Sequence, residues 1–230
     1  MDVRLDDAPF RRREGLDVLT AALGGDTGEV RFVGGVVRDT LLELAVNDVD
    51  LATIHAPDAV MERLRKAAIK AVPTGIAHGT VTAVLPSGPV EVTTLRRDVS
   101  TDGRHAVVAY STNWQEDAAR RDFTINALYA EPGTGTVHDY FGGLSDLEAR
   151  RVRFIGDPYR RIAEDHLRIL RFFRFHARFG DAVDSDGLDA CTARANDLMA
   201  LSRERIASEL LKLLVTAQAV PVIALSLIHI

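Results

Sequence analysis

The sequence predicts an α+β protein with two regions, residues 1–150 and residues 151–230. The first region combines a strand–helix–strand unit over residues 30–54 with a hairpin over residues 79–95. After residue 150 the composition becomes helical and rich in arginine. We therefore expect strands and helices in the first region and helices alone in the second.

Apolar periodicity and turn residues place each element of the first region. Leu16, Leu19 and Leu23 share one face of a helix that Gly24 and Gly25 end. The predicted elements are a helix over 11–23, strands over 30–33 and 48–54, helices over 36–45 and 56–68, hairpin strands over 79–85 and 89–95, a helix over 114–121, a segment over 124–129 and a strand over 137–140. Residues 96–113 are polar and contain a glycine, which predicts a long loop.

The second region is expected to begin with a helix over residues 158–179 and to continue with two helices in residues 184–217, the later one over 204–215. Four arginines of the first helix recur three and four residues apart and form one basic stripe. An inward stripe is formed by apolar residues, namely Leu167, Leu170, Phe173 and Ala177.

Composition excludes several classes of protein. The apolar content is 47% and the charged content 27%, as in a folded domain. A single cysteine, Cys191, excludes an internal disulfide and fits a reducing compartment, and the polar start does not predict a signal peptide. No apolar run approaches the roughly 20 residues of a membrane span. We therefore expect a cytoplasmic protein without a membrane partner.

The net charge of −5 does not indicate nucleic-acid binding, and the distribution of charge is more informative than the total. Residues 150–178 contain nine arginines and no lysine, and within that range only Asp157, Glu164 and Asp165 oppose them. Arginine without lysine favours planar, bidentate recognition of phosphates or bases. A stripe of this kind is more often a solvated face, and that alternative stays open.

Two acids near residue 50 suggest a metal site. Asp48 and Asp50 lie two apart in the predicted strand, so their carboxylates share one face. Adjacent carboxylates repel unless a cation lies between them, and oxygen ligands suit Mg²⁺. Gly34 and Gly35 precede a predicted helix, whose free N–H groups favour a phosphate. Each motif alone is most often a turn or a strand end, and their combination is the stronger signal.

Further polar residues allow two interpretations each. Glu91 lies between two valines, so it is either a third carboxylate of the site or an ordinary solvent-facing residue. Arg120, Arg121 and Asp122 either bind a nucleoside triphosphate or form a surface ion-pair cluster. Asp165 and Arg168 can offer an acceptor and donors to the Watson–Crick edge of a base.

Four blocks of sequence together resemble the class II tRNA nucleotidyltransferases, which include CCA-adding enzymes and bacterial poly(A) polymerases of the polymerase-β-like superfamily. The blocks are residues 34–39 with 48–50, residues 120–127, residues 139–143 with 146–147, and residues 164–175. The resemblance implies a nucleotidyltransferase head with a small mixed sheet flanked by helices, residues 1–150, and an all-α neck, residues 151–230. Because family members are considerably longer, we expect the chain to be truncated within or just past the neck.

The resemblance also implies roles for individual residues. Asp48 and Asp50 are expected to hold Mg²⁺. The residues expected to bind the nucleotide are Gly34, Gly35 and Arg38 at the triphosphate, Arg121 and Asp122 of the R-R-D block, Asp165 and Arg168 at the base, and Arg171 and Arg174 around the pocket. Residues 96–113 fall where the family has a flexible loop.

The expected function is the template-independent addition of C, C and A from CTP and ATP to the 3′ end of tRNA, with no DNA partner. One alternative within the family is a poly(A) polymerase or an enzyme that adds only CC or only A. An alternative from another class is an inactive fragment that binds nucleotide or RNA without turnover.

Overall fold

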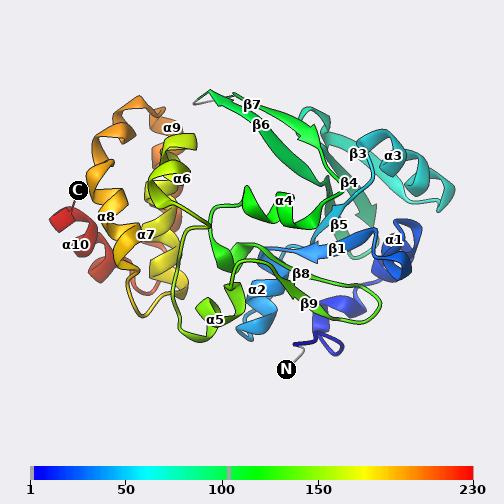
Figure 1. Cartoon of the computed structure of the whole chain (residues 1–230). Helices are drawn as coiled ribbons and strands as arrows, with labels where there is room; N and C mark the ends of the chain where they lie inside the picture. The colour runs from blue at the N-terminus through cyan, green and yellow to red at the C-terminus, as the bar shows by residue number, and fades with distance from the viewer. Residues whose placement is uncertain (1–2, 103–104, 230) are drawn as a thin grey trace. The chain divides into compact units, whose positions relative to one another are not determined.

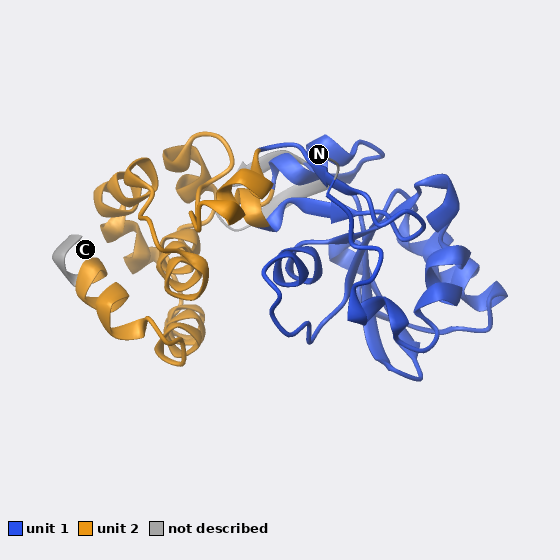
Figure 2. Ribbon diagram, turned by 90° about the horizontal axis from the view of Figure 1, so that it is seen from below, with its two compact units in different colours: residues 1–99, 107–120, 126–141 blue, residues 100–106, 121–125, 142–230 orange. Residues whose placement is uncertain are grey.

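A computed structural model describes residues 3–102 and 105–229, so predictions that fall on Gly103, Arg104 and Ile230 lie outside it. The chain forms two compact units (Figure 2). Unit 1 comprises residues 1–99, 107–120 and 126–141. Unit 2 comprises residues 100–106, 121–125 and 142–230. No helix in the described ranges is long and apolar enough to cross a membrane.

In the described part of unit 1, seven strands form one mixed sheet in the order β3-β4-β5-β2-β1-β8-β9. Figure 1 labels these strands except β2. Its strands are β1 Val30–Val33, β2 Asp50–Thr53, β3 Lys70–Gly75, β4 Thr80–Leu85, β5 Gly88–Thr94, β8 Leu128–Ala130 and β9 Val137–Asp139. Strands β2 and β5 pair in parallel, and the other neighbouring pairs are antiparallel. The mixed sheet and its helices confirm the predicted α+β class.

The helices of unit 1 are α1 Leu16–Ala22, α2 Gly35–Leu41, α3 Pro57–Lys66 and α4 Trp114–Ala119. Helix α2 packs against β1 and β8, and α3 packs against β3, β4 and β5. The predicted inward leucines of α1, Leu16, Leu19 and Leu23, are buried. Val60 and Leu64 of α3 are also buried, whereas Met61 is only half-buried.

Three predicted boundaries in unit 1 are wrong for local reasons. Gly15 has φ 85°, so α1 begins after it, and residues 9–12 form a separate 3₁₀ turn. Helix α2 ends at Leu41 because Glu43 has φ 56°, which a right-handed helix does not admit. Strand β2 begins at Asp50 rather than Asp48, and the carbonyl groups of Val46 and Asn47, just before the predicted start, accept hydrogen bonds from Arg13.

The prediction of a loop over residues 96–113 is wrong. Strands β6 Arg96–Asp102 and β7 His105–Tyr110 form a separate two-stranded sheet. Val107, Val108 and Tyr110 have the β-branched and aromatic side chains that favour strands. The polar residues around them dominate the composition of the segment, and composition alone therefore predicts a loop.

The helices of unit 2 are α5 Gly143–Glu148, α6 Pro158–Glu164, α7 Leu167–Phe179, α8 Ser185–Ala193, α9 Arg203–Leu214 and α10 Ala219–His229. The predicted helix over 158–179 is therefore two helices. Asp165 separates them with an extended backbone, φ −153°, and its Oδ1 accepts a hydrogen bond from Leu167 N at 3.1 Å. Aspartate competes with the helix for backbone N–H groups in this way. Leu167, Phe173 and Ala177 are buried as expected, whereas Leu170 is only half-buried.

The turn between β1 and α2 requires one of its two glycines. Gly34 has φ 69° and ψ −117°, a conformation that side chains rarely adopt, and its N–H donates to Leu128 O at 3.1 Å. A Cβ added at Gly35 would lie 3.7 Å from Arg38 Nη2, an ordinary contact. The backbone conformation therefore requires glycine at position 34, whereas packing does not require glycine at position 35.

We predict that Gly34→Ala lowers the free energy of unfolding by about 1–3 kcal/mol because alanine is strained at this φ and ψ. The neighbouring Gly35→Ala should change it by less than about 1 kcal/mol, since alanine suits a helix start. Urea denaturation of both variants measures the difference. Equal effects of the two substitutions would contradict the assignment of strain to Gly34.

Candidate active site

The parallel pairing of β2 and β5 brings two of the predicted acids together. Asp50 lies opposite Glu91 in this register, and paired residues of adjacent strands direct their side chains to the same face. Asp48 lies just before β2 and is exposed, and the intervening Val49 is buried, as is Leu51. The three acids therefore lie at the start of β2 and beside it on β5.

The carboxylate oxygens of these acids are the type of ligand that a divalent cation prefers. Carboxylate oxygens are the ligands of Mg²⁺, which usually takes one or two of them and completes its shell with water and substrate phosphates. Within the described ranges, no three His, Cys, Asp or Glu side chains lie close enough to hold one ion. The register itself pairs Asp50 with Glu91, and Asp48 lies two residues before Asp50, outside the strand.

Arg13 holds the segment in front of these acids, a role that sequence reasoning missed. Its Nη2 donates to the carbonyl oxygens of Val46 at 3.2 Å and Asn47 at 2.6 Å. These are the two residues before Asp48. No sequence pattern relates Arg13 to this segment, because the contact forms only when the chain folds.

Arg38 of α2 is almost fully buried, with 6% of its surface exposed. Its Nε donates to Asp39 Oδ1 at 2.7 Å, and its Nη1 donates to Asn126 Oδ1. The guanidinium thus ties α2 to the turn over residues 124–126, which follows the R-R-D block. Gly35 lies one turn before it and leaves its own side-chain position empty.

Asp122 of the R-R-D block pairs with Arg171 of α7, whose Nε donates to Asp122 Oδ2 at 2.9 Å. Burial opposes the charge of Arg171, but the adjacent carboxylate raises the pKa of the guanidinium above its ordinary value. Arg121 contributes its carbonyl oxygen, which accepts a hydrogen bond from Arg161 Nη2 at 2.5 Å. Two arginines of unit 2 therefore fix the backbone and the carboxylate of this block.

Asp146 is a second buried acid that sequence reasoning did not single out as functional. It is 0% exposed and accepts hydrogen bonds from Thr124 Oγ1 at 2.6 Å, Arg151 Nη2 at 2.6 Å and Arg153 Nε at 2.9 Å. Burial alone would raise the pKa of Asp146, but these donors together hold it below its ordinary value. Asp146 of α5 therefore anchors the block over residues 121–125 through Thr124.

Asp165 and Arg168 both have protein partners. Arg205 Nη2 donates to the two oxygens of Asp165 at 3.1 and 3.0 Å. Arg168 Nη1 donates to Arg161 O at 2.7 Å and pairs with Glu164. Both side chains lie at the α6–α7 break rather than on one continuous helix.

The arginine stripe is opposed by more acids than its own segment contains. Arg174 Nε donates to Glu209 Oε2 at 2.6 Å. Burial lowers the pKa of Arg174, and the adjacent guanidinium helps to hold the pKa of Glu209 below its ordinary value against burial. Asp122 and Glu209, the partners of Arg171 and Arg174, lie outside residues 150–178, so the count of three acids within that range does not include them.

The predicted site residues are thus divided between the two units. Unit 1 carries Gly34, Gly35, Arg38, Asp48, Asp50 and Glu91, and unit 2 carries Arg121, Asp122, Asp165, Arg168, Arg171 and Arg174. A family model described as the poly A polymerase head domain matches residues 30–153. The chain belongs to this family. The match begins at β1 and includes the residues of unit 1 that carry the glycine pair and the acids.

Relatives of this head-domain family agree with the resemblance in the sequence. The chain is 46% identical over 205 residues to the mitochondrial CCA tRNA nucleotidyltransferase 1 of Mus musculus, which covers 87% of this chain and 47% of the relative. It is 41% identical over 214 residues to the CCA-adding enzyme of Streptococcus gordonii, with 92% and 52% covered. The chain therefore spans about half the length of the curated relatives it matches.

Two solved structures are similar to most of this chain. The crystal structure of the Bacillus stearothermophilus CCA-adding enzyme in complex with CTP matches with a TM-score of 0.80 and 34% identity, over 91% of this chain and 51% of that chain. A tRNA nucleotidyltransferase complexed with a primer tRNA and an incoming ATP analog matches with a TM-score of 0.75 and 29% identity, over 92% and 60%.

We predict that Asp146→Asn lowers the free energy of unfolding by about 2–3 kcal/mol, because it removes the charge that two partly exposed arginines share. The exposed Asp186 on α8 supplies a control, Asp186→Asn, with an effect within about 0.5 kcal/mol. The folded pKa of Asp146 lies below the ordinary 3.8, so its contribution is complete above that pH and is lost as the pH falls through the folded pKa. Denaturation from neutral to acidic pH measures this, and a constant difference at every pH would contradict it.

Proposed function

We propose that this chain carries the nucleotidyl-transfer and nucleotide-selection parts of an enzyme that adds C, C and A from CTP and ATP to the 3′ end of tRNA without a template. Relatives named CCA-adding enzymes support this proposal, as do similar structures whose titles include CTP, an ATP analog and a primer tRNA. We further propose that residues 1–150 act as the nucleotidyltransferase head and residues 151–230 as a helical neck.

The observation that carries the proposal is the alignment of Asp50 with Glu91 across parallel strands, with Asp48 two residues before. In the proposed reaction the 3′-hydroxyl of the RNA attacks the α-phosphorus of CTP or ATP, and pyrophosphate leaves. Asp48 and Asp50 would hold Mg²⁺, and Glu91, which pairs with Asp50 across the strands, would add a third negative charge. When bound, Mg²⁺ lowers the pKa of the hydroxyl and neutralises charge on the phosphates.

The residues at the start of α2 bind the triphosphate in this proposal. The backbone N–H groups after Gly34 and Gly35 have no partner within the first turn of a helix and can donate to phosphate oxygens. Arg38 lies one turn further and adds positive charge. Its hydrogen bonds to Asp39 and Asn126 hold the guanidinium in one orientation, which favours positioned rather than diffuse charge.

The residues of unit 2 select the base. Asp165 and Arg168 supply an acceptor and donors for the Watson–Crick edge of a base. The protein, rather than a template strand, therefore recognises the incoming base. Arg205 orients the Asp165 carboxylate, and Glu164 orients Arg168. Arg121 contacts the nucleotide, Asp122 positions Arg171, and Arg171 and Arg174 complete the pocket.

We predict that Asp48→Asn and Asp50→Asn each lower the transfer of cytidylate from CTP by about 10²- to 10³-fold, because each loses one carboxylate that holds Mg²⁺. The assay follows labelled CTP into tRNA that ends before CCA, with Mg²⁺ present. Asp58→Asn removes an exposed acid from the first turn of α3 and should leave the rate unchanged. Transfer at the wild-type rate by either variant would overturn the metal assignment.

We predict that Asp165→Ala lowers the preference for CTP over UTP by about tenfold or more, because the base loses a specific hydrogen-bond partner. Competition between labelled CTP and UTP measures the preference directly. Asp189→Ala, an exposed acid on α8, is the matched control. An unchanged ratio of the two incorporation rates would remove Asp165 from base selection.

Poly(A) addition is the second candidate, because the matching family model is described as a poly A polymerase head. Separate assays with CTP alone and ATP alone distinguish the two. CCA addition requires CTP incorporation into tRNA that lacks CCA, whereas a poly(A) polymerase extends with ATP alone. A chain that binds CTP without incorporating it would be the inactive fragment.

We also propose that the reaction takes place in the cytoplasm. The proposal is supported by Cys191, whose free thiol fits a reducing compartment. The thiol is buried in α8, and burial raises its pKa, which keeps it protonated and unreactive. The mitochondrial names of some relatives describe those proteins. Expression of the tagged chain in its own cells, followed by fractionation, tests the compartment.

A further inference from the structure

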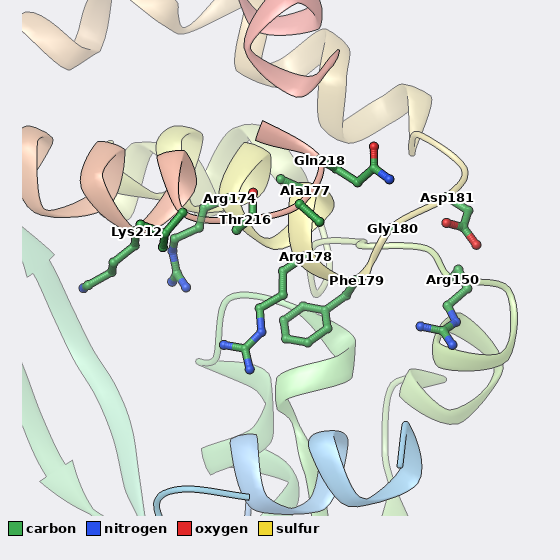
Figure 3. A pocket seen from close by; sticks show the side chains of 12 residues that line it. Arg150, Arg174, Ala177, Arg178, Phe179, Gly180, Asp181, Lys212, Thr216 and Gln218 are labelled. Atoms are coloured by element: carbon green, nitrogen blue, oxygen red, sulfur yellow. The ribbon is translucent and has the colours of Figure 1, made fainter. Parts of the chain in front are cut away.

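Two cavities differ in how they relate to the proposed chemistry. The cavity of unit 2, about 670 Å³, is lined in part by Arg174, which the proposed function already uses (Figure 3). The cavity of unit 1, about 530 Å³, lies between the 3₁₀ turn Pro9–Arg12 and the segment that follows α2, and its lining includes Phe10, Arg13 and Val46. Because the two segments do not pack fully against each other, contact between them depends on side chains long enough to cross the gap.

The segment over residues 44–49 leads directly to the proposed metal ligands and has no regular secondary structure. Leu44, Ala45, Asn47 and Asp48 are exposed. The next fully buried side chain is that of Val49, with 1% of its surface exposed. Packing therefore does little to fix the backbone before Asp48, although Asp48 lies outside strand β2 and takes its position from this segment.

Arg13 supplies hydrogen bonds where packing is weak. Its Nη2 donates to Val46 O at 3.2 Å and to Asn47 O at 2.6 Å, the carbonyl groups of the two residues before Asp48. A charged donor forms a stronger hydrogen bond than a neutral one. One guanidinium thus restrains two consecutive peptide groups next to Asp48.

Arg13 is itself mounted on the core of unit 1. Its N–H donates to Phe10 O at 3.2 Å, and its carbonyl oxygen accepts from Leu16 N at 3.1 Å. The ring of Phe10 is buried and packs edge-on against Phe32 of β1, with 4.9 Å between the ring centroids. Strand β1 pairs with β2, which carries Asp50. Arg13 therefore holds the segment before Asp48 in a fixed relation to the sheet that carries Asp50.

We propose that Arg13 is a positioning residue of the metal site, which orders the backbone before Asp48 and thereby raises the affinity of Asp48 and Asp50 for a divalent cation. The proposal rests on the proposed function, since it concerns the cation of that reaction. A cation that binds a disordered segment must offset the entropy lost on ordering it. A segment already held by Arg13 makes that cost smaller, which is the general advantage of a preorganised site.

The first test measures the binding of Mn²⁺ alone to the 230-residue chain, by the electron paramagnetic resonance signal of the free ion. Arg13→Ala should raise the Kd for Mn²⁺ about tenfold, as the loss of groups that support metal ligands commonly does. Arg13→Lys keeps the charge but not the planar fork, so its Kd should lie between those of Arg13→Ala and wild type. Arg12→Ala is the matched control, because Arg12 is exposed and ends the same 3₁₀ turn. Equal Kd values for Arg13→Ala and Arg12→Ala would overturn the proposal.

A second comparison shows whether Arg13 acts through Asp48. In the Asp48→Asn background, Arg13→Ala should cause no further loss of Mn²⁺ affinity, because the carboxylate that Arg13 positions is already absent. A tenfold loss in both backgrounds would place the action of Arg13 elsewhere and contradict the proposal.

Backbone ¹⁵N relaxation of the metal-free chain gives a readout that needs no cation. The order parameters of Asn47 and Asp48 should fall from about 0.85 in wild type to below about 0.6 in Arg13→Ala, while those of α1 and β1 stay unchanged. Lower order parameters throughout unit 1, with Mn²⁺ affinity equal to that of wild type, would make Arg13 a general stabilising residue and overturn the proposal. Failure of the proposed metal site appears separately, as Mn²⁺ affinity that Asp50→Asn does not change.

Discussion

Buried charge must be paired, and in unit 2 this requirement fixes the segment over residues 121–125. Asp146 is fully buried, and it is tolerated because Thr124, Arg151 and Arg153 all donate to it. Asp122 is held in the same way by Arg171 of α7. The two carboxylates hold one short stretch of backbone between α5 and α7. Side chains that the nucleotide would contact are therefore mounted on a segment with little freedom to move.

In unit 1 the corresponding constraint is the parallel junction between β2 and β5. A parallel pair requires a crossover, here α3 with β3 and β4, and the register then follows from the pairing. That register puts Glu91 beside Asp50. Arg13 and Arg38 hold the segments on either side, one at the carbonyl groups before Asp48 and the other at Asn126. The site in unit 1 is therefore built from strand pairing first and from side-chain hydrogen bonds second.

Local patterns predicted the elements well where one physical preference dominated. The strand over Val30–Val33 and the hairpin formed by β4 and β5 follow from β-branched residues and turn residues, and the structure contains both. The break at Asp165 was missed because apolar periodicity continues across it, whereas the aspartate side chain ends the helix. The strand β7 was missed because polar neighbours outweighed its valines in the composition of the segment.

Partners distant in sequence could not be predicted. Arg205 and Glu209 of α9 neutralise Asp165 and Arg174 of unit 2, and no spacing in the sequence relates these pairs. The same holds for Arg13 and the carbonyl group of Asn47. The arginine stripe was therefore predicted correctly as a row along α7, but its charge balance required the fold. The proposed roles of Asp165 and Arg168 come from the family resemblance, because periodicity alone left them open.

The central claim is that this chain itself distinguishes the base of the incoming nucleotide. Calorimetric titration of the 230-residue chain with CTP and with UTP, in the presence of Mg²⁺ and without RNA, tests it most directly. We expect CTP to bind at least about tenfold more tightly than UTP, because one specific set of hydrogen bonds is available only to the correct base. Equal affinity for the two nucleotides would contradict it.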